Sequence, residues 1–213
     1  MRVTLKITCL ILSLTLFTIS SCKGQHSNIP AKECIELNNK GLDLLMNYPM
    51  NGEQELDKAV DLFKQAITCD STDWVFYNNL ANAYEKKHNY NGELIELNKL
   101  LILNENYPMF IISKGMVFEK INKIDSANKM YDFANVEFKK RLAKNPEDVG
   151  LIQGVIQLKA ITLGKDSAIK EIDNQIKLHP NLSSKLSYEY EYYKYFNRHN
   201  YIYGLPTEID SSK

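Results

Sequence analysis

The feature that most constrains this chain is a set of small and bulky side chains that recurs every 34 residues between residues 59 and 134. The recurring positions are Ala59, Glu93 and Ala127; Phe63, Leu97 and Tyr131; Ala66, Leu100 and Ala134; and Ala81 with Gly115. A period of this length is typical of helical arrays, in which each unit buries its apolar face only by stacking on its neighbours. Between Leu56 and Ile67 the apolar residues also follow the three-and-four spacing of an amphipathic helix. We therefore expect an all-α fold of stacked helical hairpins.

These positions resemble the tetratricopeptide repeat family, in which small and aromatic residues alternate at fixed places in a 34-residue unit. The two clearest units match the family at Tyr77, Leu80, Ala81 and Tyr84, and at Ile111, Gly115, Phe118, Ala127, Tyr131 and Ala134. A modified unit precedes them from Cys34, with an insertion at 47–53, and another follows with Ile152 and Pro180. The resemblance implies a right-handed α-solenoid of about four antiparallel hairpins over residues 31–181. A capping helix and tail are expected at 182–213.

The first 21 residues are typical of a secretory signal peptide. Arg2 and Lys6 precede an almost entirely apolar run at residues 7–19. That run is shorter than the roughly 20 residues that a membrane-spanning helix needs. We therefore expect residues 1–21 to direct the chain across a membrane and to be removed.

The end of this segment, Ile19 to Cys22, has an aliphatic residue, two small residues and a cysteine, and resembles the lipobox of bacterial lipoproteins. The resemblance implies that Cys22 becomes the first mature residue and carries the lipid, with residues 22–30 as a tether. Lys23 follows the cysteine without an acidic run, which in such lipoproteins favours the outer membrane and a periplasm-facing position. An ordinary signal peptide cut nearby, or an uncleaved anchor, is the alternative.

The charge and motif content argue against several classes of function. The chain has 26 basic and 26 acidic residues, so it lacks the basic excess that nucleic-acid binding requires. We find no catalytic motif and no metal-ligand spacing among the four histidines, which are His26, His88, His179 and His199. We expect a protein that is not an enzyme and that uses no cofactor or metal.

Two cysteines remain once the signal peptide and the lipid site are set aside. Cys34 opens the first helix of the first hairpin and Cys69 closes the second, so both lie at the same end of an antiparallel pair. The periplasm is oxidising. A disulfide between them would close a loop of about 35 residues and stabilise the fold by roughly 3 to 4 kcal/mol. Two separately buried thiols are the alternative.

A concave groove is the binding surface that the family resemblance implies, because the first helix of each hairpin lines it. The candidate groove residues are Asn38, Asn78, Asn82, Glu85, Met109, Met116, Gln153 and Gln157. Amide side chains can donate to and accept from the backbone of a bound peptide. Methionine adapts to varied apolar surfaces. For any single residue, a solvated or half-buried helix position is the alternative.

A second candidate surface is the tyrosine-rich last helix, which we expect from Leu182 to Arg198. Tyr188, Tyr192 and Tyr195 share one face of it, opposite the face expected to cap the fourth unit. Tyrosine is enriched at binding hot spots, so this face is a candidate docking site. The alternative is that residues 201–205 fold back and cover it.

Two functional hypotheses follow. The first is a lipid-anchored scaffold on the outer membrane that binds a peptide or another envelope protein through the groove or the tyrosine face. The second is a lipoprotein that captures a glycan or another nutrient for an outer-membrane transporter. The single tryptophan, Trp74, argues against the second, since glycan capture relies on aromatic platforms. Neither the identity of the partner nor the oligomeric state follows from the sequence.

Overall fold

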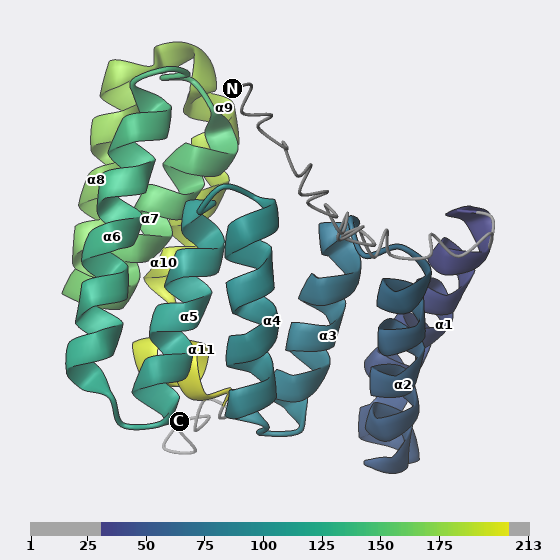
Figure 1. Cartoon of the computed structure of the whole chain (residues 1–213). Helices are drawn as coiled ribbons and strands as arrows, with labels where there is room; N and C mark the ends of the chain where they lie inside the picture. The colour runs from purple at the N-terminus through teal and green to yellow at the C-terminus, as the bar shows by residue number, and fades with distance from the viewer. Residues whose placement is uncertain (1–30, 205–213) are drawn as a thin grey trace, which may run out of the picture.

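A computed structural model of the chain describes residues 31–204, apart from the side chains of residues 31 and 49–51, and over this range the fold is all-α (Figure 1). The signal peptide, lipobox and tether lie outside these residues. Long helices form four hairpins: α1 (Ala31–Asn51) with α2 (Gln54–Cys69), α3 (Trp74–Lys86) with α4 (Tyr90–Leu103), α5 (Pro108–Lys120) with α6 (Ile124–Leu142), and α7 (Val149–Leu163) with α8 (Lys165–Leu178). The expected hairpin array is confirmed.

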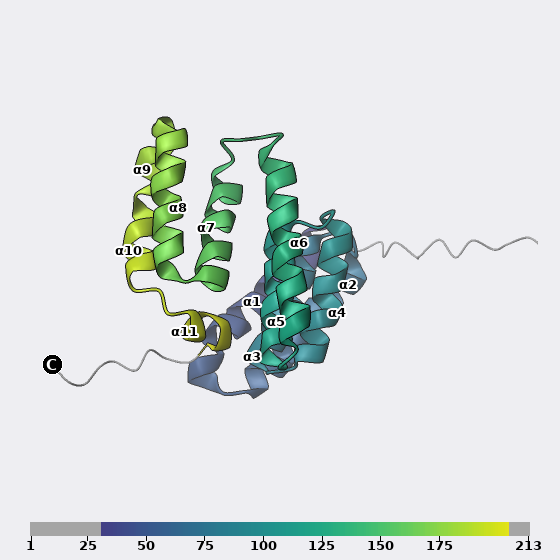
Figure 2. The same cartoon turned by 90° about the vertical axis from the view of Figure 1, so that its left-hand side faces the viewer.

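The hairpins stack in chain order, because the second helix of each packs on the first helix of the next (Figures 1 and 2). The insertion at 47–53 lengthens α1 and ends in a turn at Gly52, where φ is +91°. Polar side chains cap several of the helices that follow. Asp73 accepts a hydrogen bond from the backbone N–H of Val75, and Asp148 accepts one from that of Leu151. Such caps satisfy backbone donors that a helix leaves unpaired at its start.

In the first and third hairpins, a glycine of the first helix lies against an aromatic ring of the second helix. A Cβ atom at Gly115 would lie 2.5 Å from the ring of Tyr131, and one at Gly41 would lie 2.8 Å from Phe63. Both rings are buried. The aromatic residue of the second helix therefore lies directly on the backbone of the first, and a larger side chain at either glycine would force it away.

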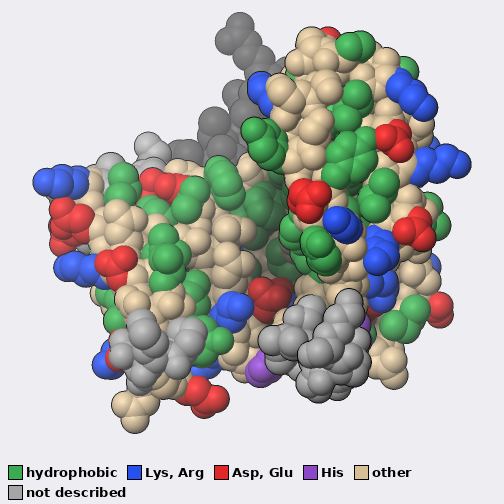
Figure 3. All heavy atoms as spheres, turned by 180° about the vertical axis from the view of Figure 1, so that it is seen from behind, with side chains coloured by type: hydrophobic (Ala, Val, Ile, Leu, Met, Phe, Trp, Pro, Cys, Tyr) green, Lys and Arg blue, Asp and Glu red, His purple; other side chains and the backbone are tan. Residues whose placement is uncertain are grey.

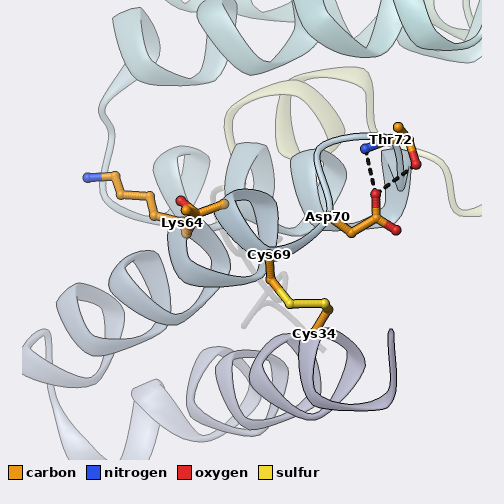
Figure 4. Close-up of a disulfide and its surroundings, with 6 residues drawn as sticks. Cys34, Lys64, Cys69, Asp70 and Thr72 are labelled. Atoms are coloured by element: carbon orange, nitrogen blue, oxygen red, sulfur yellow. Dashed lines mark hydrogen bonds between the residues drawn. A yellow bond between two sulfur atoms is a disulfide. The ribbon is translucent and has the colours of Figure 1, made fainter. Parts of the chain in front are cut away.

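The first hairpin is closed by a disulfide between Cys34, near the start of α1, and Cys69, at the end of α2 (Figure 4). Their Cα atoms lie 5.5 Å apart. Beside the bridge, the Asp70 carboxylate accepts hydrogen bonds from the backbone N–H and the hydroxyl of Thr72, at 2.9 and 2.7 Å. The structure thus contains the cross-linked form rather than two separate thiols.

The C-terminal region differs from the single helix expected between Leu182 and Arg198. It contains η1 (Pro180–Leu182), α9 (Ser183–Leu186), α10 (Tyr188–Lys194) and α11 (Arg198–Tyr203). The break after α9 falls at Ser187, whose hydroxyl donates to the Ser183 carbonyl at 2.6 Å, a side-chain bond that competes with regular helix. Leu186 and Tyr193 both reach the core of the fourth hairpin as a result.

Candidate partner-binding site

The residues expected to line one continuous groove lie in three different environments. Asn38 is only 5% exposed, and its Oδ1 accepts a hydrogen bond from Nδ2 of Asn79 at 2.8 Å. This pair joins α1 to α3 and leaves Asn38 inside the helix packing, which corrects the expectation that it faces an open groove. Asn78 is half-buried and Asn82 is exposed, one turn apart on α3. These two amides remain accessible.

Glu85, on the same helix, belongs to a charged cluster with Lys120 and Glu93. The Lys120 ammonium, which is nearly buried, donates to the Glu85 carboxylate at 2.5 Å. Glu93 is buried, and its Oε2 has no hydrogen-bond partner. Burial, together with the charge of Glu85, raises the pKa of Glu93 to about 7, against an opposing effect of Lys120. Glu85 is therefore engaged within the protein rather than free for a partner.

The two groove methionines pack against a core cluster that includes the last helix. Met109 and Met116 are half-buried beside Ile112 and Ile202. Ile202 belongs to α11 and is only 1% exposed. Figure 2 shows α11 crossing from the end of α10 toward α5. The C-terminal helix thus lies against the face of α5 and α7 that the sequence assigned to a ligand.

An ion pair links α11 to α5. The Arg198 guanidinium donates to Oε1 of Glu119 at 2.6 Å, and the hydroxyl of Tyr131 donates to the same oxygen at 2.8 Å. The Arg198 side chain also bonds the carbonyl oxygen of Ile161 on α7. Glu119 is buried, so both donors compensate the cost of removing its charge from water.

The remaining candidate residues meet on one surface, where α7, α10 and α11 come together. Gln153 donates to the Glu189 carboxylate at 2.7 Å, and Gln157 donates to the hydroxyl of Tyr201. The groove amides of α7 therefore adjoin the tyrosines of α10. Two pockets lie here, and Tyr192 and Tyr201 line both of them.

The inner pocket has a volume of about 340 Å³ and the outer pocket about 460 Å³. The inner pocket is lined by Gln153, Gln157, Tyr188, Glu189, Tyr192, Tyr193 and Tyr201. The outer pocket is lined by Glu191, Tyr192, Tyr195, Phe196, Asn197, Asn200 and Tyr201. Two of the predicted groove residues, Gln153 and Gln157, therefore share a site with the predicted tyrosine face.

The tyrosine face is not covered by the segment that follows it. Tyr188, Tyr192 and Tyr195 are 82%, 52% and 72% exposed. Tyr201 forms a wall beside them instead of a lid, because Ile202 anchors α11 in the core. Figure 3, which views the side of α10, shows the molecular surface hollowed between the N-terminal and C-terminal helices. Of the two alternatives for residues 201–205, covering does not occur over 201–204, and Leu205 lies outside the described residues.

Sequence reasoning missed α11 and its ion pair. Two local signals could have indicated the helix. The Asn197 side chain caps it by accepting from the N–H of Asn200, and Gly204 ends it with φ of +67°, a left-handed conformation that favours glycine. The pairing of Arg198 with Glu119 had no such signal, because 79 residues separate them.

Over residues 31–204 the structure contains neither a metal-ligand cluster nor a membrane-spanning helix. No group of three histidine, cysteine or carboxylate side chains in this range could hold a metal ion. Within the same range, none of the helices combines the length and the apolar character that crossing a membrane requires.

Comparison with known proteins agrees with the repeat architecture. The tetratricopeptide repeat family model matches residues 62–94, from α2 across α3 into α4. Two Hsp70-Hsp90 organising proteins, from Plasmodium falciparum and from its isolate 3D7, are each 30% identical to this chain over 79 residues, or 37% of its length. The matched segment is 31% of the first relative and 14% of the second, so this chain spans less than a third of either.

Among solved structures, the crystal structure of MamA matches 72% of this chain and 87% of its own chain, at 16% identity and a TM-score of 0.42. The fold defines the chain as an all-α protein of stacked helical hairpins, and residues 62–94 match a tetratricopeptide repeat.

Proposed function

We propose that this protein is a non-enzymatic scaffold, lipid-anchored to the bacterial outer membrane and facing the periplasm, that binds another envelope protein. The observation that carries the proposal is the surface at which Gln153 and Gln157 of the last repeat meet the exposed tyrosines of α10. We place the binding surface here rather than in an open groove along the first helices, because α11 packs against α5 and α7.

The composition of the surface suits a protein partner. Tyrosine offers a large apolar area with few rotatable bonds and a polar tip, and it is enriched among residues that dominate binding energy. The amides nearby can donate to or accept from a peptide backbone. The Plasmodium falciparum relatives are named for organising Hsp70 and Hsp90, so sequence similar to this chain occurs in proteins whose named role concerns other proteins.

The membrane anchor rests on the sequence of the N-terminus alone. Ile19 to Cys22 follows a short apolar run in the order that a lipobox requires. The Cys22→Ser variant tests this part. We expect wild-type protein to incorporate an alkyne-labelled palmitate and to sediment with membranes, and the variant to do neither. Retained label in the variant would contradict lipidation at Cys22.

The binding surface is tested by site-specific photo-crosslinking in cells. A benzoylphenylalanine placed at Tyr188 should cross-link an envelope protein. The same probe at Ile102, which is 75% exposed on α4, should not cross-link that protein. The partner is then identified by mass spectrometry, and the adduct should disappear when Tyr192→Ala is added. The proposed surface would be contradicted if the probes at both positions cross-linked the same protein equally, or if the probe at Tyr188 cross-linked none.

A further inference from the structure

The two pockets share a composition that points to the charge of what they bind. Each has one carboxylate, Glu189 in the inner and Glu191 in the outer, and each is otherwise lined by aromatic and amide side chains. Among the described residues, no lysine, arginine or histidine lines either pocket. The site therefore combines negative charge with aromatic faces.

The rings are arranged at steep angles to one another rather than as one flat platform. Tyr192 and Tyr193 have centroids 4.9 Å apart and planes 88° apart, and Tyr192 and Phe196 are inclined by 55°. Phe196 and Tyr201, on the other side, are inclined by 46°. These inclined rings line parts of both pockets, and a cation placed over the face of such a ring is attracted by its quadrupole.

The electrostatic surroundings agree with this arrangement. Burial, and then the charge of Glu189, raises the pKa of both Tyr192 and Tyr193, so the negative field of this carboxylate extends over the rings. The Lys194 ammonium already lies 5.3 Å from the ring centroid of Tyr195, and Tyr195 lines the outer pocket. One aromatic face of this surface thus attracts a cation within the protein itself.

We propose that the inner and outer pockets bind lysine or arginine side chains carried by the protein partner. This proposal rests on the scaffold function above and gives the chemistry of its partner. The two pockets share Tyr192 and Tyr201 as walls, so two basic residues close together on the partner would occupy both. Charge complementarity selects this occupant, since an acidic segment would meet Glu189 and Glu191.

Titration calorimetry on the full-length protein in detergent tests the proposal with defined probes. The first is an eight-residue peptide of alternating lysine and serine, with both ends blocked. The second has glutamate in place of lysine, and the third is maltoheptaose, a neutral glycan. We expect the lysine peptide to bind, the glutamate peptide and the glycan not to bind, and affinity to fall with added salt.

Variants distinguish binding within the two pockets from a general attraction between opposite charges on the protein and the peptide. Tyr188→Ala and Glu189→Gln should each weaken binding of the lysine peptide, by about two- to tenfold. Glu36→Gln removes an exposed carboxylate of α1, and Phe133→Ala removes a ring of α6; neither residue lines either pocket. Neither control should change affinity. Circular dichroism verifies that each variant is folded.

Several outcomes would overturn the inference. Equal binding of the lysine and glutamate peptides, unchanged affinity in Glu189→Gln, or binding of maltoheptaose instead would each do so. The scaffold function fails separately, if the photo-crosslinker at Tyr188 captures no envelope protein. A cross-linked partner together with no affinity for the lysine peptide would retain the scaffold and reject the cationic ligand.

Discussion

The two ends of the repeat array are completed in different ways. At the N-terminal end, the disulfide between Cys34 and Cys69 closes a hairpin whose buried clusters are small, and α1 exposes Ile35 and Met46. At the C-terminal end, η1 and α9 to α11 add buried side chains to the last repeats and fasten them with polar contacts. A terminal repeat lacks a neighbour on one side. Here one end relies on a covalent bond, whereas the other gains an extra layer that also forms the candidate site.

The largest expected effect is loss of the disulfide. Cys34→Ser with Cys69→Ser should lower the free energy of unfolding by about 3 to 4 kcal/mol, because the unfolded chain regains the entropy of an open loop of about 35 residues. Urea denaturation followed by circular dichroism measures this. Amide hydrogen exchange should become faster in α1 and α2, because these helices open more often without the cross-link. An equal loss of protection in α7 and α8 would contradict a locally acting bond.

The second largest effect on stability is expected at Glu93 of α4, which lies between the two ends of the array. Burial raises its pKa to about 7 in the folded protein, above the ordinary value of 4.5 for a glutamate. The folded state therefore binds the proton more tightly, and the contribution of Glu93 to stability falls as pH rises from 4.5 to 7 and levels off above. The decline should be on the order of 2 kcal/mol.

Glu93→Gln measures this effect, because the amide cannot ionise. The variant should gain stability relative to wild type as pH rises through this range, in urea denaturation at several pH values. Glu55→Gln, on the first turn of α2, is the control and should show no such gain. A constant difference between Glu93→Gln and wild type from pH 4.5 to 8 would refute the assignment.

A smaller effect is expected at the ion pair of the C-terminal layer. Arg198→Ala should cost about 1 to 2 kcal/mol, because Glu119 stays buried with one donor fewer while Arg198 itself is partly exposed. Amide hydrogen exchange should accelerate more in α11 than in α1. Lys170→Ala, an exposed cation of α8, should leave α11 unchanged. If α11 kept its protection in Arg198→Ala, the packing of Ile202 and the hydrogen bond from Gln157 to Tyr201 would be sufficient to hold the helix.

The smallest effect on stability is expected within the candidate site. Tyr188→Ala should change the free energy of unfolding by no more than about 0.5 kcal/mol, because the ring is 82% exposed. The same variant should weaken partner binding, as measured by calorimetry. A loss of stability comparable to that of the disulfide variant would show that Tyr188 serves the fold rather than a partner.

Much of the fold follows from residues close together in sequence. Gly115 lies under Tyr131 and Gly41 lies under Phe63, and each of these pairs is contained within one hairpin. The candidate site was foreseen less well. The exposed tyrosines of α10 follow from helical spacing, but Asn38 is buried in a pair with Asn79, and the methionines of α5 pack in the core. Whether a helix position faces solvent depends on what the neighbouring repeat brings against it.

The sequence by itself therefore determined the hairpins and the spacing that stacks them, because helix periodicity and close glycine contacts are local properties. Only the tertiary structure decided that α11 returns to α5, that Arg198 meets Glu119, and that the amides of α7 join the tyrosines of α10. These contacts join residues 36 to 79 positions apart. They form because stacking the last repeat leaves an apolar face that Ile202 fills, and no local pattern specifies that placement.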